Sequence, residues 1–108
     1  DAESPALALW IVESYAKRQE YALLCALQKA AVTRESLRAV LEQTIPLLRS
    51  AMRGRAADRT VDGTAPLSLD AAVYGIDCVE EALAGLESNG NAGLLALRLA
   101  AELMEKGA

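Results

Sequence analysis

Residues 92–105 read Ala-Gly-Leu-Leu-Ala-Leu-Arg-Leu-Ala-Ala-Glu-Leu-Met-Glu, and this stretch decides the fold. Alanine and leucine are strong helix formers, so the stretch predicts an α-helix. At 100° per residue its apolar side chains fall on two nearly opposite stripes, which leave only a narrow polar arc. One stripe holds Leu94, Leu97, Ala101 and Met104, and the other holds Leu95, Leu99 and Leu103. A helix that is apolar on both sides needs cover on both sides.

The residues that precede this helix predict a helical hairpin. Ser88-Asn89-Gly90-Asn91 is a strong turn signal, and Asn91 can cap the helix that follows. Ser68 is a good N-cap for a further helix over 69–87. That helix has a regular apolar stripe made of Ala72, Ile76, Val79, Leu83 and Leu86. The short turn between the two helices predicts an antiparallel pair at the C-terminus.

Two more helices are expected towards the N-terminus. Thr33 is an N-cap candidate for a helix over 34–53, in which Pro46 predicts a kink or a split. Ser4 is an N-cap candidate for a helix over 4–30, with Pro5 at its first position. The fully polar turn Lys17-Arg18-Gln19-Glu20 is either a water-exposed waist in that helix or a break.

These segments predict an all-α, four-helix bundle-like single domain over 1–108. Residues 54–67 lack periodicity and contain two glycines and a proline, so we expect a loop or a long crossover there. The chain of 108 residues is 53% hydrophobic and 24% charged, which is ordinary for a globular domain. No segment has the sustained alternation of a half-buried strand. The expected helices are about 4–30, 34–53, 69–87 and 92–105.

The residue inventory gives little support for catalysis. The chain has no histidine, so the commonest general base and the commonest metal ligand are both absent. Cys25 and Cys78 lie in apolar helical contexts, and we expect inert, reduced thiols in a cytoplasmic protein. No glycine-rich phosphate loop is present, and no apolar run reaches the length of a membrane span. We therefore expect no enzymatic activity, no cofactor, no metal and no membrane partner.

Two apolar surfaces are candidate contacts with protein. On the wheel of the expected 4–30 helix, Trp10, Tyr21 and Leu24 lie opposite the core stripe, where exposed aromatic residues often anchor binding. On the 92–105 helix, Leu95, Leu99 and Leu103 are candidates for a seam between two chains. The 4–30 helix would be about 40 Å long and the 92–105 helix about 21 Å, and the overhang favours a second chain. We expect a homodimer, in which Leu99→Asp gives a monomer or an aggregate.

Residues 26–41, Ala-Leu-Gln-Lys-Ala-Ala-Val-Thr-Arg-Glu-Ser-Leu-Arg-Ala-Val-Leu, resemble the core of the helix-turn-helix motif of bacterial regulators. The resemblance implies a turn at 30–33 with Val32 buried, followed by a recognition helix in the DNA major groove. The local excess of arginine over 31–55 suits contact with phosphates, although the whole chain has a net charge of −4. The DNA-contacting residues implied by the resemblance are Arg34, Glu35, Ser36 and Arg38.

The sequence therefore favours a small, non-enzymatic protein–protein interaction module that acts by burying a helical surface. Such a module could be a regulator, an adaptor, a chaperone-like partner or an inhibitor. The alternative is a helix-turn-helix DNA-binding regulator that uses residues 26–41. The two hypotheses differ in a simple measurement, since DNA binding through arginines weakens steeply as salt rises.

Overall fold

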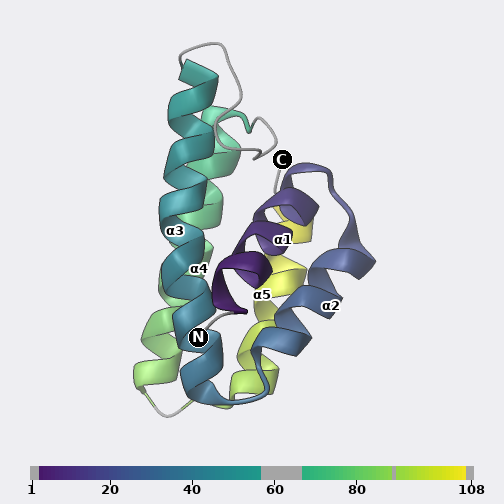
Figure 1. The fold of residues 1–108 in the computed structure, drawn as a ribbon, viewed down its shortest axis with the longest axis vertical. Coiled ribbons are helices and arrows are strands. Elements are labelled where there is room, and N and C mark those ends of the chain that lie inside the picture. The colour runs from purple at the N-terminus through teal and green to yellow at the C-terminus, as the bar shows by residue number, and fades with distance from the viewer. Residues whose placement is uncertain (1–2, 57–66, 89, 107–108) are drawn as a thin grey trace.

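A computed structural model describes residues 3–56, 67–88 and 90–106, which form five α-helices and no β-strand (Figure 1). The prediction of an all-α, bundle-like fold is confirmed. Of the expected loop at 54–67, residues 57–66 lie outside the described part of the chain. The helices are α1 (Ser4–Ala16), α2 (Glu20–Ala30), α3 (Arg34–Ala56), α4 (Leu69–Glu87) and α5 (Ala92–Lys106).

The five helices pack as a closed ring around an aliphatic core. α1 packs against α2 and α3, α3 against α4, α4 against α5, and α5 against α2. Figure 1 shows α3 and α4 side by side, with α5 behind α1 and beside α2. α4 and α5 run in opposite directions and contact each other, as the C-terminal hairpin prediction requires. Each helix therefore has two main neighbours, and α5 lies between α4 and α2.

The polar turn near residue 18 is a break, so the expected 4–30 helix is two helices. Arg18 has a left-handed backbone with φ of 55°. The Gln19 N–H donates to Ser14 O at 2.9 Å, and the Arg18 N–H donates to Tyr15 O at 3.2 Å. These two bonds and the left-handed residue define a Schellman motif, which is a common way for a helix to end. The chain reverses here, and α2 folds back onto α1.

Three of the expected N-caps are confirmed by hydrogen bonds. Thr33 Oγ1 accepts from the Ser36 N–H at 2.9 Å, and Ser68 Oγ accepts from the Ala71 N–H at 3.1 Å. Asn91 Oδ1 accepts from the Leu94 N–H at 3.0 Å. Each side chain satisfies one of the backbone donors that a helix start leaves without an intrahelical partner.

Two expectations about helix geometry need correction. Ser4 is not the N-cap of α1, because Glu3 occupies that position and Ser4 is already helical, with its side chain buried. Pro46 does not split its helix, since α3 is continuous through it. Pro46 is exposed, on the side where a missing N–H is tolerated best. Within the described residues, no helix combines the length and the hydropathy needed to cross a membrane.

Tyr15 joins two elements that are distant in sequence. Its ring is buried, and its hydroxyl donates to the carbonyl oxygen of Ala71 at 2.5 Å. Gly75 makes room for the ring, because a Cβ at that position would lie 2.9 Å from Tyr15 Cε2. This packing holds α1 against α4 across the middle of the ring of helices.

We predict that Tyr15→Phe lowers the free energy of unfolding by about 1 kcal/mol, since a buried hydrogen bond is lost while the ring is kept. The measurement is urea denaturation followed by circular dichroism. Tyr21→Phe is the matched control, because Tyr21 is exposed and its variant is expected to unfold like the wild type. Equal stability of all three proteins would show that the Tyr15 hydroxyl contributes nothing.

Candidate interaction surface

One apolar stripe of α5 faces the core of its own chain. Leu99 and Leu103 are only 1% and 2% exposed, and Ala96 and Ala100 are also buried. Leu95 is partly buried against α4, where a Cβ on Gly85 would lie 2.8 Å from Leu95 Cδ2. α4 and α2 cover the two flanks of this stripe.

The expected seam between chains at Leu95, Leu99 and Leu103 therefore needs correction. These side chains are sheltered by helices of the same chain and offer little surface to a second one. The expectation failed because the break at Arg18 provides a fifth helix, α2, which covers the flank that appeared to need an outside partner. Leu99→Asp is now expected to unfold the chain, because it buries a carboxylate without a partner.

The opposite stripe of α5 is exposed. Leu94 is 67% exposed, Leu97 is 49% exposed, and Ala101 is also exposed, while Met104 is partly buried. These residues follow one another at helical spacing, so their side chains share one face of α5. A row of large aliphatic side chains in water is unfavourable, and on a small protein such a row often marks a contact surface.

α2 extends this apolar surface. Its Tyr21 is 80% exposed and its Leu24 is half-buried. Val32, in the loop between α2 and α3, is 77% exposed. The two helices are antiparallel neighbours. The Arg18 guanidinium before α2 donates to Met104 O at the end of α5, at 2.9 Å. Residues 31–34 line a shallow pocket with residues 90–93 at the other end. We call the surface made by Tyr21, Leu24, Val32, Leu94, Leu97 and Ala101 the α2/α5 face.

Trp10 does not belong to the α2/α5 face. The expected grouping of Trp10 with Tyr21 and Leu24 assumed one continuous helical wheel, and the break at Arg18 removes that relation. Trp10 lies on α1 and is 38% exposed. Its role as a separate anchor stays a prediction. Val32 was expected to be buried in the turn of a helix-turn-helix motif, and it was not grouped with Tyr21 and Leu24.

The helix-turn-helix residues are arranged differently from the motif. Val32 is exposed rather than buried in the turn, and α3 is a long helix of 23 residues. The Arg34 guanidinium donates to Leu86 O in the last turn of α4. A cation at the C-terminal end of a helix is stabilising, so Arg34 has a structural task here. Glu35 and Arg38 are exposed, and Ser36 is half-buried, with its backbone N–H capped by Thr33.

We predict that Arg34→Ala lowers the free energy of unfolding by about 1 kcal/mol, because a charge-assisted hydrogen bond at a helix end is lost. Thermal unfolding measures the effect. Arg38→Ala, one turn further along α3, is the control and is expected to leave the melting temperature unchanged. A larger loss in Arg38→Ala than in Arg34→Ala would contradict the assignment.

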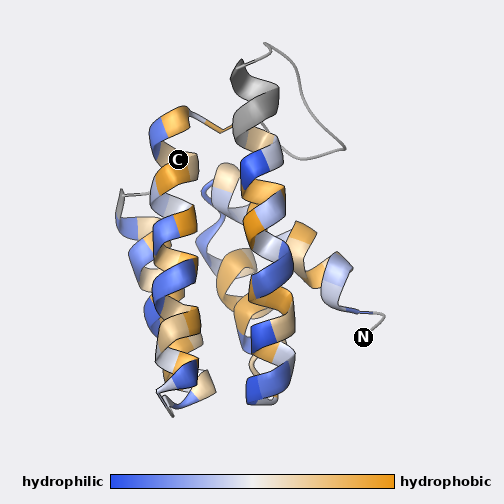
Figure 2. Ribbon diagram, turned by 90° about the vertical axis from the view of Figure 1, so that its left-hand side faces the viewer, coloured by the Kyte–Doolittle hydropathy of each residue, from blue (hydrophilic) through white to orange (hydrophobic). Residues whose placement is uncertain are grey.

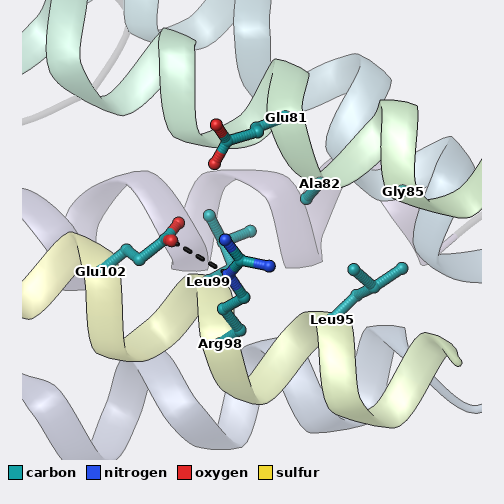
Figure 3. Close-up of a pocket in the computed structure, with 7 residues that line it drawn as sticks. All are labelled: Glu81, Ala82, Gly85, Leu95, Arg98, Leu99 and Glu102. Carbon is teal, nitrogen blue, oxygen red and sulfur yellow. Dashed lines mark hydrogen bonds and ion pairs between the residues drawn. The ribbon is translucent and has the colours of Figure 1, made fainter. Parts of the chain in front are cut away.

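One groove between α4 and α5, lined by Glu81, Gly85, Leu95 and Arg98, is too small for an organic ligand. Its volume is about 70 Å³, whereas sites for small molecules measure ≈ 300–1,000 Å³. Figure 3 shows Arg98 across the groove, with Glu81 projecting from α4 towards it. Arg98 Nε donates to Glu102 Oε2 at 3.1 Å, within α5. An exposed pair of this kind contributes only a few tenths of a kcal/mol.

Two titratable groups beside this groove, Tyr74 and Cys78, are held neutral. Burial, with the neighbouring Cys78 and the carboxylates of Glu102 and Glu105, raises the pKa of Tyr74 to about 12. The neutral Tyr74 hydroxyl donates to Glu102 O at 2.8 Å. Burial also raises the pKa of the Cys78 thiol. Both groups are therefore protonated at neutral pH, and a protonated thiol is a poor nucleophile. In the described part of the chain, no three acidic or cysteine side chains gather as a metal site.

The face made by α3 and α4 differs from the α2/α5 face. Figure 2, which looks onto α3 and α4, shows hydrophilic residues that interrupt the hydrophobic ones along both helices. Exposed apolar side chains also occur on α4, at Leu69 and Val73 near its start. Charged residues such as Asp77, Glu80 and Glu81 follow them along the same helix.

Comparisons of the chain with family models, with curated proteins and with solved structures give no match.

Proposed function

We propose that this protein is a non-enzymatic protein–protein interaction module and that the α2/α5 face is its binding surface. The observation that carries the proposal is the exposure of large apolar side chains on two helices that pack side by side. Burial of such side chains contributes about 25 cal/mol for each Å² removed from water. Association would therefore proceed through burial of surface, without bond chemistry.

Tyr21 has the features of an anchor in this surface. Tyrosine brings a large, rigid ring and a polar hydroxyl, and it is enriched among residues that dominate binding energy. Leu24 of the same helix is partly exposed, and Leu97 of the neighbouring helix is 49% exposed. A partner would thus meet one aromatic ring surrounded by aliphatic side chains.

The helix-turn-helix alternative has no comparable support. Arg34, the first residue of its recognition helix, is engaged with the end of α4. The interaction proposal expects no salt-dependent binding to duplex DNA.

We predict that Leu97→Glu removes binding partners that the wild-type protein retains, because a charge in the centre of an apolar contact has to be desolvated. The measurement is affinity capture from a cell extract of immobilised wild type, Leu97→Glu and Leu69→Glu, with the retained proteins quantified by mass spectrometry. Leu69 is the matched control, since it is an exposed leucine on α4, outside the α2/α5 face.

Proteins retained by wild type and Leu69→Glu but lost from Leu97→Glu would support the proposal. The same set on all three baits would refute a role for the face. Circular dichroism of each variant checks that its fold is intact.

A further inference from the structure

We propose that the α2/α5 face takes a second copy of this chain, docked about a two-fold axis with the two α5 helices antiparallel. The inference rests on the proposed function, since it names the occupant of the same surface. It deepens the homodimer expectation by assigning the contact to the outer stripe of α5, with a definite register. Three features of the face favour its own copy over an unrelated partner.

The first feature is the spacing along α5. The apolar positions Leu94, Leu97, Ala101 and Met104 are separated by three, four and three residues. This order of steps is the same in both directions, so an antiparallel copy brings Leu94 opposite Met104 and Leu97 opposite Ala101. Ala101 is small, and the Leu97 side chain of the second copy fits over it. A two-fold contact needs such self-complementarity.

The second feature is the position of the apolar residues at the two ends of α2. Tyr21 lies at the end of the face that is closed by Arg18 and Met104, whereas Val32 lies at the end beside residues 90–93. A two-fold axis through the middle of α5 exchanges these ends. It therefore places the Tyr21 ring near Val32 of the second copy, and the two most exposed apolar residues of the face cover each other.

The third feature is the charge along the edge of the stripe. Arg98 and Glu105 lie on the same edge of α5, because each lines a pocket with residues of α4. In the antiparallel register, Arg98 of one copy is offset from Glu105 of the other by about 7 Å along the axis, which an arginine side chain can span. The two Arg98 residues lie near the axis, and each is already paired with Glu102 of its own chain.

The size of the face limits the strength of the dimer. α5 has 15 residues, so the face is about 22 Å long and, with α2, about 20 Å wide. Such a contact falls at the small end of specific interfaces, which bury ≈ 800 Å² per partner at standard size. We therefore expect a dimer that dissociates on dilution.

Cysteine cross-linking tests the register. In a background of Cys25→Ser and Cys78→Ala, Arg98→Cys places two thiols about 3 Å apart along the axis, whereas Leu94→Cys places them about 15 Å apart. A short bismaleimide is expected to link Arg98→Cys into a dimer at least tenfold faster than Leu94→Cys. Equal rates, or faster linkage of Leu94→Cys, would overturn the antiparallel register. The background protein without cysteine is the blank.

Light scattering over a range of concentrations tests whether the α2/α5 face binds a second copy of the chain. The wild type and Leu69→Glu are expected to approach twice the chain mass of 11.4 kDa as concentration rises, and Leu97→Glu is expected to stay at the monomer mass. A monomeric wild type at millimolar concentration would overturn this inference, while selective loss of captured partners in Leu97→Glu would still support the proposed function. A dimer that survives Leu97→Glu would place self-association elsewhere on the chain.

Discussion

The left-handed turn at Arg18 is the constraint on which the rest of the structure depends. A non-glycine residue in this conformation costs about 1–2 kcal/mol. The Schellman hydrogen bonds formed by the Arg18 and Gln19 N–H groups, and the bond from the Arg18 guanidinium to Met104 O, offset that cost. Because the chain reverses here, α2 lies beside α5 instead of continuing α1. Without this reversal α5 would have α4 as its main neighbour, and its inner stripe would be partly open to water.

The position of α5 between α4 and α2 explains why one of its apolar stripes is buried and the other is exposed. Gly85 on α4 makes room for Leu95, and the small Ala96 and Ala100 are buried on α5 itself. Leu99 and Leu103 are buried on the same side of α5 and belong to the core. A helix with two neighbours still has one outer arc, and on α5 that arc carries Leu94 and Leu97 beside the charged Arg98 and Glu105. The apolar outer arc is the feature that fold stability does not require.

Much of the fold could be predicted from the sequence, because its signals are local. The caps at Thr33, Ser68 and Asn91 begin three helices, and the expected bounds of α4 are those of the structure. The break at Arg18 could be anticipated only as one of two alternatives, since a polar turn without glycine or proline does not select a left-handed residue. At Pro46 a kink and a split were both expected as alternatives, and the split does not occur, because a proline on the solvent side interrupts an α-helix less than its isolated propensity suggests.

The candidate surface was predictable only in part. The excess of apolar perimeter on α5 was visible in the sequence, and it does mark the surface now proposed. Which stripe would be exposed depended on the number of helices around α5, and that number depended on the break at Arg18. Tyr21 is exposed, as expected from the sequence, whereas Leu24 is partly buried against the core, and both belong to a helix that packs against α5. Tertiary packing decided these relations, and no single helical wheel contains them.

The most direct test of the central claim is the accessibility of leucine methyl groups to a soluble paramagnetic probe, measured by nuclear magnetic resonance on the dilute protein and on the concentrated protein. The Leu99 methyls are predicted to be protected under both conditions. The Leu94 and Leu97 methyls are predicted to be accessible at dilution and protected at high concentration. Accessible Leu99 methyls, or Leu94 and Leu97 methyls already protected in the dilute monomer, would contradict the division of α5 into a core side and an association side.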